Sequence, residues 1–147
     1  IEATASYRFN DAWTLQGTYT LTDSEQKSGA AAGRPLTDTP EHMVNANLRW
    51  NVTDRMNLWL RGEYRSARYR GIGDAQTALG DYEAYGLFHL GGAYRIDDNL
   101  TVNAAIYNLL DKDFVRLLPY GDPVLYAPQY ANNQEPRRLW VSITAAF

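Results

Sequence analysis

Strict alternation of apolar and polar residues is the feature that most limits how this chain can fold. It recurs in seven segments of the 147-residue sequence. The second segment runs from Trp13 to Thr22, and its apolar residues alternate with four threonines and one glutamine. A helical repeat of about 3.6 residues scatters these polar residues around an axis, whereas a strand places them all on one face. The sequence therefore predicts an all-β chain whose strands have one apolar and one polar face.

The seven predicted strands are joined by connections that are short and long in strict alternation. Three connections are tight polar turns, and three are much longer. The predicted strands are Ile1–Phe9, Trp13–Thr22, Pro40–Asn51, Met56–Arg65, Ala84–Ile96, Leu100–Tyr107 and Arg138–Phe147. The short turns are Asn10–Ala12, Val52–Arg55 and Asp97–Asn99, and the long loops are Ser24–Thr39, Tyr69–Glu83 and Lys112–Glu135.

This alternation is typical of bacterial outer-membrane barrels, which have short periplasmic turns and long extracellular loops. A soluble up-and-down barrel has no physical need for short connections at one end and long connections at the other. The mean hydropathy of −0.46 does not argue against a membrane protein, because barrel strands expose only alternate residues to lipid. The pattern predicts an antiparallel transmembrane β-barrel with extracellular long loops and a periplasmic C-terminus.

Aromatic residues favour the same placement. The chain holds 11 Tyr and 4 Trp, which settle readily at membrane interfaces. One group lies beside the short turns or at the terminus, and a second lies toward the long loops. We expect these to form two aromatic girdles: Phe9, Trp13, Trp50, Tyr94 and Phe147 on the periplasmic side, and Tyr19, Tyr64, Tyr85 and Phe88 on the extracellular side.

A sheet in a membrane must close, because hydrocarbon offers no water to its edge N–H and C=O groups. Single-chain bacterial barrels close with an even number of strands, and seven is odd. We therefore expect further strands upstream of Ile1. A cryptic eighth strand within Lys112–Glu135 is the alternative, and the three prolines of that loop disfavour it.

Other classes of function find little support in the sequence. Cysteine is absent, which excludes disulfides and thiolate metal sites, and the net charge of −3 gives no signature of nucleic-acid binding. His42 and His89 lie on separate predicted strands without metal-ligand spacing. An outer-membrane hydrolase needs a nucleophile and a base near one rim, and no such pair is evident. A small soluble ligand-binding barrel remains an alternative, which independence from detergent would reveal.

Three stretches resemble a known family. They are Leu36–Trp50 (LTDTPEHMVNANLRW), Tyr107–Phe114 (YNLLDKDF) and Glu135–Phe147 (EPRRLWVSITAAF). Together they resemble TonB-dependent siderophore receptors, especially the ferric catecholate and colicin receptor branch, over essentially the whole chain. The resemblance implies the last seven strands of a roughly 22-stranded plugged barrel, with the plug domain and earlier strands absent. It implies import of a ferric siderophore as transported ligand, with no intrinsic cofactor and no enzymatic activity, although haem, cobalamin and carbohydrate remain open.

The same resemblance implies a set of partners. The TonB–ExbB–ExbD complex would act on the absent plug, and the barrel would contact outer-membrane lipid and lipopolysaccharide. The barrel assembly machinery would recognise the terminal aromatic residue, Phe147, as an assembly signal. Colicins or phages are further candidate partners, and nucleic acid is not expected.

Candidate site residues fall into two groups. Arginine beside tyrosine suits an anionic aromatic iron chelate, by charge and by cation–π contact, although loops of such barrels are rich in both residues regardless of ligand. Charged residues on the polar faces would cost about 2–4 kcal/mol per arginine if they faced lipid, so we expect them to face the lumen or plug. The ligand candidates are Arg68, Tyr69, Arg70, Arg116, Tyr120, Tyr126 and Tyr130, and the lumen candidates are Arg49, Arg61, Glu63, Arg65, Arg95 and Arg138.

Overall fold

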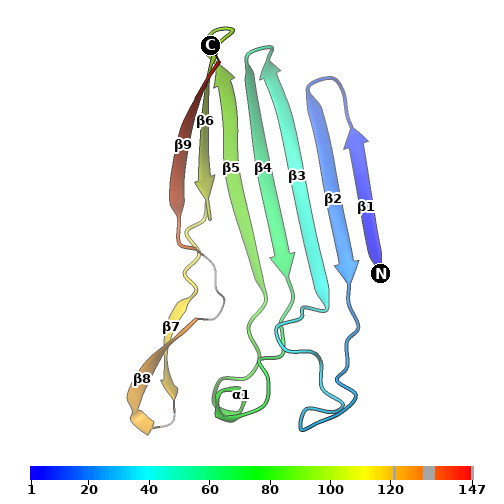
Figure 1. Cartoon of the computed structure of the whole chain (residues 1–147), viewed down its shortest axis with the longest axis vertical. Helices are drawn as coiled ribbons and strands as arrows, with labels where there is room; N and C mark the ends of the chain where they lie inside the picture. Colours follow the sequence, from blue (N-terminus) through cyan, green and yellow to red (C-terminus); the bar gives the residue numbers. More distant parts are fainter. Residues whose placement is uncertain (121, 131–134, 147) are drawn as a thin grey trace.

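The computed structural model describes residues 1–120, 122–130 and 135–146, with side chains for residues 1–114 and 135–146. Seven strands form one antiparallel sheet in the order β1-β2-β3-β4-β5-β6-β9 (Figure 1). Their number matches the sequence-based prediction. The strands are β1 (Glu2–Arg8), β2 (Trp13–Leu21), β3 (His42–Thr53), β4 (Met56–Arg65), β5 (Tyr85–Arg95), β6 (Leu100–Tyr107) and β9 (Arg138–Ala145).

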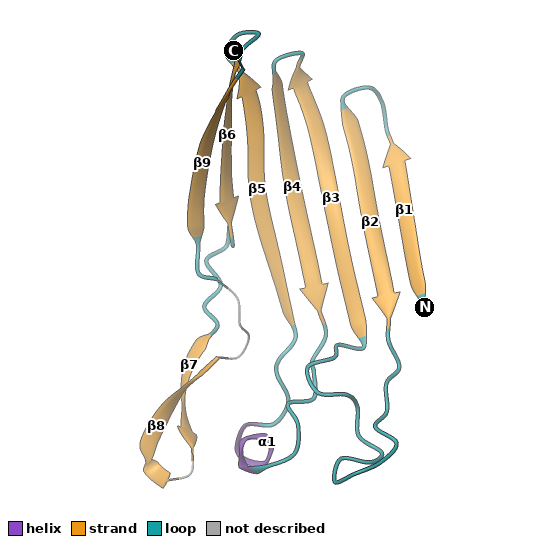
Figure 2. Cartoon of the chain, in the orientation of Figure 1, coloured by secondary structure: helices purple, strands orange, loops and turns teal. Residues whose placement is uncertain are grey.

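The connections sort to opposite ends of this sheet (Figure 2). The short turns after β1, β3 and β5 lie at one end, beside the C-terminus. The long connections lie at the other end, together with helix α1 (Asp74–Leu79) and strands β7 (Val115–Tyr120) and β8 (Asp122–Tyr130). We call these the short-turn end and the long-loop end. The sequence correctly predicted which connections share an end.

The pairing register gives the sheet one continuous apolar face. Directly paired residues lie on the same face, so an apolar residue opposite an apolar residue extends the surface from strand to strand. One such row crosses six strands through Leu15, Leu48, Leu60, Leu90, Ile106 and Leu139. On β9, Leu139, Val141 and Ile143 are 73%, 66% and 67% exposed. A surface this apolar and this exposed requires an apolar environment, as the lipid of a membrane provides.

The opposite, polar face carries residues such as Thr14, Asn47 and Ser142, paired with one another in the same way. A single layer leaves little to bury. Among the described residues, the buried apolar cluster consists of Tyr85, Leu87 and Phe114. Tyr85 pairs with Arg65 and therefore lies on the polar face. Its placement in an extracellular aromatic girdle was wrong, because the alternation places Gly86 and Phe88, not Tyr85, on the apolar face.

The Gly91-Gly92 pair in β5 permits two close approaches. A Cβ at Gly91 would overlap the indole of Trp59 and lie 2.9 Å from the carbonyl oxygen of Ala104. A Cβ at Gly92 would overlap the carbonyl oxygen of Asn57 and lie 2.7 Å from Leu58 Cδ2. Neighbouring backbone and side chains thus occupy the space that any larger residue needs, as glycine in a strand often indicates.

The long loops contain elements that the sequence did not predict. The loop after β4 includes the six-residue helix α1, and the loop after β6 includes β7 and β8, which pair as a separate two-stranded hairpin. The expectation that Lys112–Glu135 lacks strands was therefore wrong. The hairpin does not join the seven-stranded sheet, so it is not an eighth wall strand. In the described part of the chain, no helix is long and apolar enough to cross a membrane.

Candidate functional site

Asn108 closes the base of the last long loop. Its side chain is fully buried, and its φ of 49° lies in the left-handed region, which asparagine tolerates better than most residues. The amide nitrogen Nδ2 donates to the carbonyl oxygens of Lys112 at 2.9 Å and Glu135 at 3.3 Å, and Oδ1 accepts from the Lys112 N–H at 2.9 Å. One side chain thus joins both ends of the loop, which gives the YNLLDKDF stretch a structural role.

The stem of this loop also packs on the sheet. Phe114 meets Tyr85 edge to face, with ring centroids 5.5 Å apart, and both side chains are buried. The backbone N–H of Asn108 donates to Nδ1 of His89 at 3.1 Å. Because Tyr85 and His89 lie on the polar face, the loop stem covers the long-loop end of that face.

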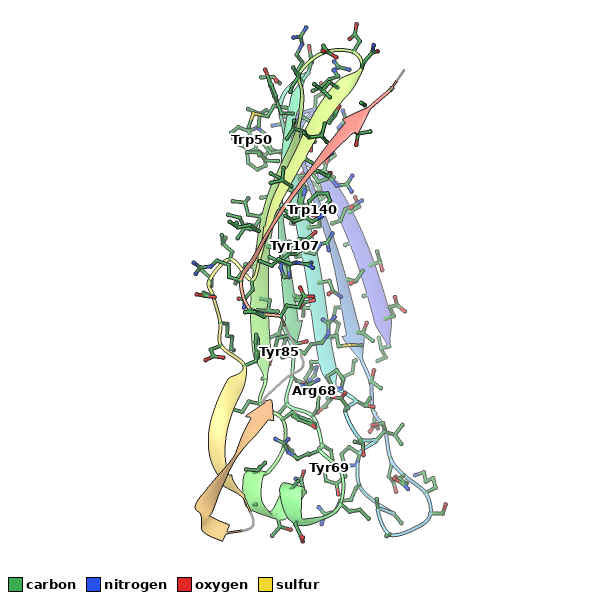
Figure 3. All side chains as sticks on the ribbon, turned by 60° about the vertical axis from the view of Figure 1, so that its left-hand side comes forward. Trp50, Arg68, Tyr69, Tyr85, Tyr107 and Trp140 are labelled. Atoms are coloured by element: carbon green, nitrogen blue, oxygen red, sulfur yellow. The ribbon has the colours of Figure 1, made fainter. Side chains whose placement is uncertain are left out.

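Arg68 lies at the same end, near Tyr85 (Figure 3), and its guanidinium group contacts two tyrosine rings. Its guanidinium carbon is 5.2 Å from the ring centre of Tyr82 and 5.6 Å from that of Tyr85. Nη1 forms an ion pair of 2.7 Å with Asp38, and the side chain is only 12% exposed. Nε and Nη2 are buried and have no hydrogen-bond partner among the described residues, so the aromatic faces supply their stabilisation.

These contacts tie two long loops together. The Asp38 N–H donates to the carbonyl oxygen of Tyr69 at 2.9 Å, and Arg68 and Tyr82 exchange two backbone hydrogen bonds. Arg70 stacks on Tyr82 at 3.9 Å and donates from Nε to the carbonyl oxygen of Gly80 at 2.9 Å. The result is a cluster of two arginines and aromatic rings at the long-loop end, which we call the Arg68 cluster: Asp38, Arg68, Tyr69, Arg70, Tyr82 and Tyr85.

The structure brings three of the seven ligand candidates, Arg68, Tyr69 and Arg70, into this cluster. The backbones of the other four lie in the hairpin, Arg116 and Tyr120 on β7 and Tyr126 and Tyr130 on β8, and their side chains are outside the described part. Sequence reasoning missed Asp38, Tyr82 and Tyr85. Asp38 comes from a different long loop, and Tyr82 and Tyr85 lie well away from Arg68 along the chain, so their contacts with it are tertiary and the local sequence carries no signal for them.

The lumen candidates share the polar face, but their environments differ. Arg65 lies 3.8 Å from Glu63 and donates to Asn45 Oδ1 at 3.2 Å, and Arg138 pairs with Glu135 at 3.2 Å. Arg95 donates to the Asp54 carbonyl oxygen at 3.2 Å. Neither Arg49 nor Arg61 forms an ion pair with any described residue. The proposed assembly signal, Phe147, lies outside the described residues.

The two histidines have separate structural partners. His42 Nδ1 lies 2.9 Å from the Tyr19 hydroxyl, and His89 accepts the N–H of Asn108. Among the residues described, no group of three or more His, Cys, Asp or Glu side chains is placed to hold a metal ion.

A sheet with a lipid-type face, short turns at one end and long loops at the other defines the wall of an outer-membrane β-barrel. Residues 1–109 match the family model described as "TonB dependent receptor-like, beta-barrel". The chain therefore belongs to the TonB-dependent receptor family, as the resemblance in its motifs indicated.

Relatives support this membership along the chain. The chain is 38% identical to the iron-regulated outer membrane virulence protein of Vibrio cholerae over 99% of its residues, and 30% identical to the ferric enterobactin receptor of Pseudomonas aeruginosa over 92%. It spans 21% and 19% of these relatives, about a fifth of their length. A crystal structure of a mutant P. aeruginosa ferric enterobactin receptor aligns over 99% of this chain and 22% of its own, with a TM-score of 0.76 and 23% identity.

Proposed function

We propose that the complete protein is an outer-membrane receptor that imports a ferric siderophore of the catecholate type. The relatives support the siderophore class, since their names include ferric enterobactin receptors and the catecholate siderophore receptor Fiu of Escherichia coli. The fold alone does not choose the ligand, because the copper transporter OprC aligns with a TM-score of 0.73 at 19% identity. The observation that carries the proposal is the Arg68 cluster at the long-loop end.

The chemistry of the Arg68 cluster suits this ligand class. A ferric catecholate is anionic and aromatic, so it is attracted by guanidinium groups and by tyrosine rings. Arg68 is already held by Asp38 and two rings, and we assign it a positioning role. Tyr69 has no side-chain interaction with any described residue, and toward these residues the Arg70 side chain donates a hydrogen bond only from Nε. We propose that the Tyr69 hydroxyl and the remaining N–H groups of Arg70 contact the ligand, together with the hairpin residues named above.

We propose a matching orientation, plug and energy source for the complete receptor. The long-loop end faces the exterior, where the ligand arrives, and the C-terminus faces the periplasm. A plug domain fills the bore of a barrel of about 22 strands. The TonB–ExbB–ExbD complex acts on that plug to release the ligand inward. Colicin-type toxins are candidate partners of the outer surface, since the fold is shared with the FpvAI receptor of a pyocin S2 complex.

Binding of a chelate panel to the complete receptor in detergent tests the ligand class. The panel contains a ferric tricatecholate, a ferric hydroxamate, haem and cobalamin, and quenching of tryptophan fluorescence reports binding. We expect the catecholate to bind most tightly. Tight binding of haem or cobalamin with no binding of any ferric siderophore would contradict the proposal.

The variant Tyr69→Leu tests the place of binding. Losing one hydrogen bond and one aromatic face should cost about 1–2 kcal/mol, which weakens catecholate affinity roughly tenfold. Tyr64→Leu is the matched control, because Tyr64 lies on the apolar face and is 43% exposed there. Equal affinities of the two variants would show that Tyr69 does not contact the ligand.

A further inference from the structure

A second candidate site lies on the polar face, in the half of the sheet toward the short-turn end. It is a hollow of about 390 Å³ between β3 and β4. The register places Arg49 opposite Trp59 and Asn47 opposite Arg61. The two arginines are therefore diagonal neighbours on one face, about 7–8 Å apart along the backbone diagonal, with their Cβ atoms somewhat closer. The polar and aromatic lining is Asn47, Arg49, Asn51, Asn57, Trp59 and Arg61.

The charges of this hollow are not balanced. Its lining holds two guanidinium groups and no carboxylate. Elsewhere on the polar face, Arg65 has Glu63 and Arg138 has Glu135 within 4 Å. Arg49 and Arg61 have no such partner among the residues that the structure describes. Two like charges at this spacing repel each other, so an anion between them would stabilise both.

The hollow is shaped by specific packing and is more than a chance gap between flexible side chains. Gly91 on β5 leaves room for the Trp59 indole, since a Cβ there would overlap the ring. Trp59 in turn supports Arg61, whose guanidinium carbon lies 5.4 Å from the ring centre. The asparagine at position 51 is also fixed, because its Nδ2 donates to the Asp11 carbonyl oxygen at 3.4 Å. Arg61 is therefore held in place by Trp59 before any ligand binds.

We propose that this hollow binds a carboxylate of an aspartate or glutamate on the domain that fills the barrel bore. The proposal rests on the proposed function, which supplies that plug. Once the bore is filled, Arg49 and Arg61 lose most of their water, and a buried charge without a partner is strongly unfavourable. A carboxylate offers about four acceptor positions, which two guanidinium groups and neighbouring amides can satisfy together. The hollow also lies next to the short turn between β3 and β4, at the end of the sheet opposite the Arg68 cluster.

Zero-length cross-linking of the complete receptor tests this contact. We would prepare Arg49→Lys and Arg61→Lys and treat each with a water-soluble carbodiimide. The reagent activates a carboxylate, and the lysine amine then displaces the urea leaving group to form an amide bond, with net loss of one water. We expect mass spectrometry to find a peptide joining position 49 or 61 to an Asp or Glu of the plug. The variant Arg8→Lys is the matched control, because Arg8 lies 2.5 Å from Asp11 and should link to it.

Two results would overturn the proposal. In the first, the lysine at position 8 reacts, but the lysines at positions 49 and 61 form no link to the plug. Links from positions 49 and 61 to carboxylates of the barrel alone would count as the same result. The other is loss of catecholate binding in Arg49→Ala and Arg61→Ala without any plug link, which would make the hollow a ligand subsite. Failure of the chelate panel alone would contradict the proposed ligand and leave the cross-link prediction in force, so the two failures are distinguishable.

Discussion

Replacing Gly92 by alanine is expected to remove most of the folded receptor from the outer membrane. The new Cβ would overlap the Asn57 carbonyl oxygen and lie 2.7 Å from Leu58 Cδ2. The carbonyl belongs to the backbone of the neighbouring strand, which cannot move without disturbing the β4–β5 ladder. Overpacking of this kind costs about 1–3 kcal/mol or more. The measurement is the fraction of complete receptor that shows heat-modifiable migration on gels, which reports a closed barrel.

Gly86→Ala is the matched control for this prediction. Gly86 lies on the same strand and the same apolar face, but a Cβ there would lie 3.6 Å from the nearest atom, the Glu63 carbonyl oxygen. That is an ordinary contact, so we expect this variant to fold like the wild type. Equal folding of both variants would show that the close approach at Gly92 is not required.

Replacing Asn108 by alanine is expected to release the last long loop while the sheet stays folded. The change removes three side-chain hydrogen bonds to Lys112 and Glu135, and buried groups left without partners cost about 1–3 kcal/mol each. Alanine at a φ of 49° adds about 1 kcal/mol. A local loss of about 3 kcal/mol corresponds to roughly 100-fold faster hydrogen exchange. Exchange mass spectrometry of peptides covering residues 109–114 measures it.

Two further variants separate the causes. Asn108→Gly relieves the backbone strain but lacks the side-chain hydrogen bonds. We therefore expect residues 109–114 of this variant to exchange hydrogen much faster than in the wild type. Asn108→Asp keeps Oδ1 and loses the two donors, and we expect an intermediate rate. Wild-type exchange in Asn108→Gly would mean that backbone conformation, and not the side-chain hydrogen bonds, holds the loop.

The wall of the molecule was predictable from sequence because its determinants are local. A residue such as Leu48 or Leu139 is apolar, its neighbours are polar, and a period of two assigns the face without reference to any other strand. The sorting of short and long connections to opposite ends follows from the same alternation. Among the girdle residues that the structure describes, Tyr85 was misplaced: it stands at the end of its strand, where a lipid-facing tyrosine and a lumen-facing tyrosine have the same sequence context.

The candidate site was predictable only in part. Arg68, Tyr69 and Arg70 were found because they are adjacent, but Asp38 and Tyr82 reach them from other parts of the chain through tertiary contacts. The hairpin of β7 and β8 was missed because Pro119, Pro123 and Pro128 argue against strands in general. Proline is tolerated at strand edges, and an isolated two-stranded hairpin has two edges.

The apolar face of the sheet is expected to contact lipid in the complete receptor. A nitroxide scan of β9 in the complete receptor, reconstituted in a bilayer, tests it most directly, and the absence of cysteine in this chain simplifies single-site labelling. We predict that labels at positions 139, 141 and 143 collide with oxygen and are shielded from a water-soluble nickel complex. Labels at positions 142 and 144 should show lower oxygen collision rates. The reverse pattern, or no alternation along the strand, would show that this face does not contact lipid.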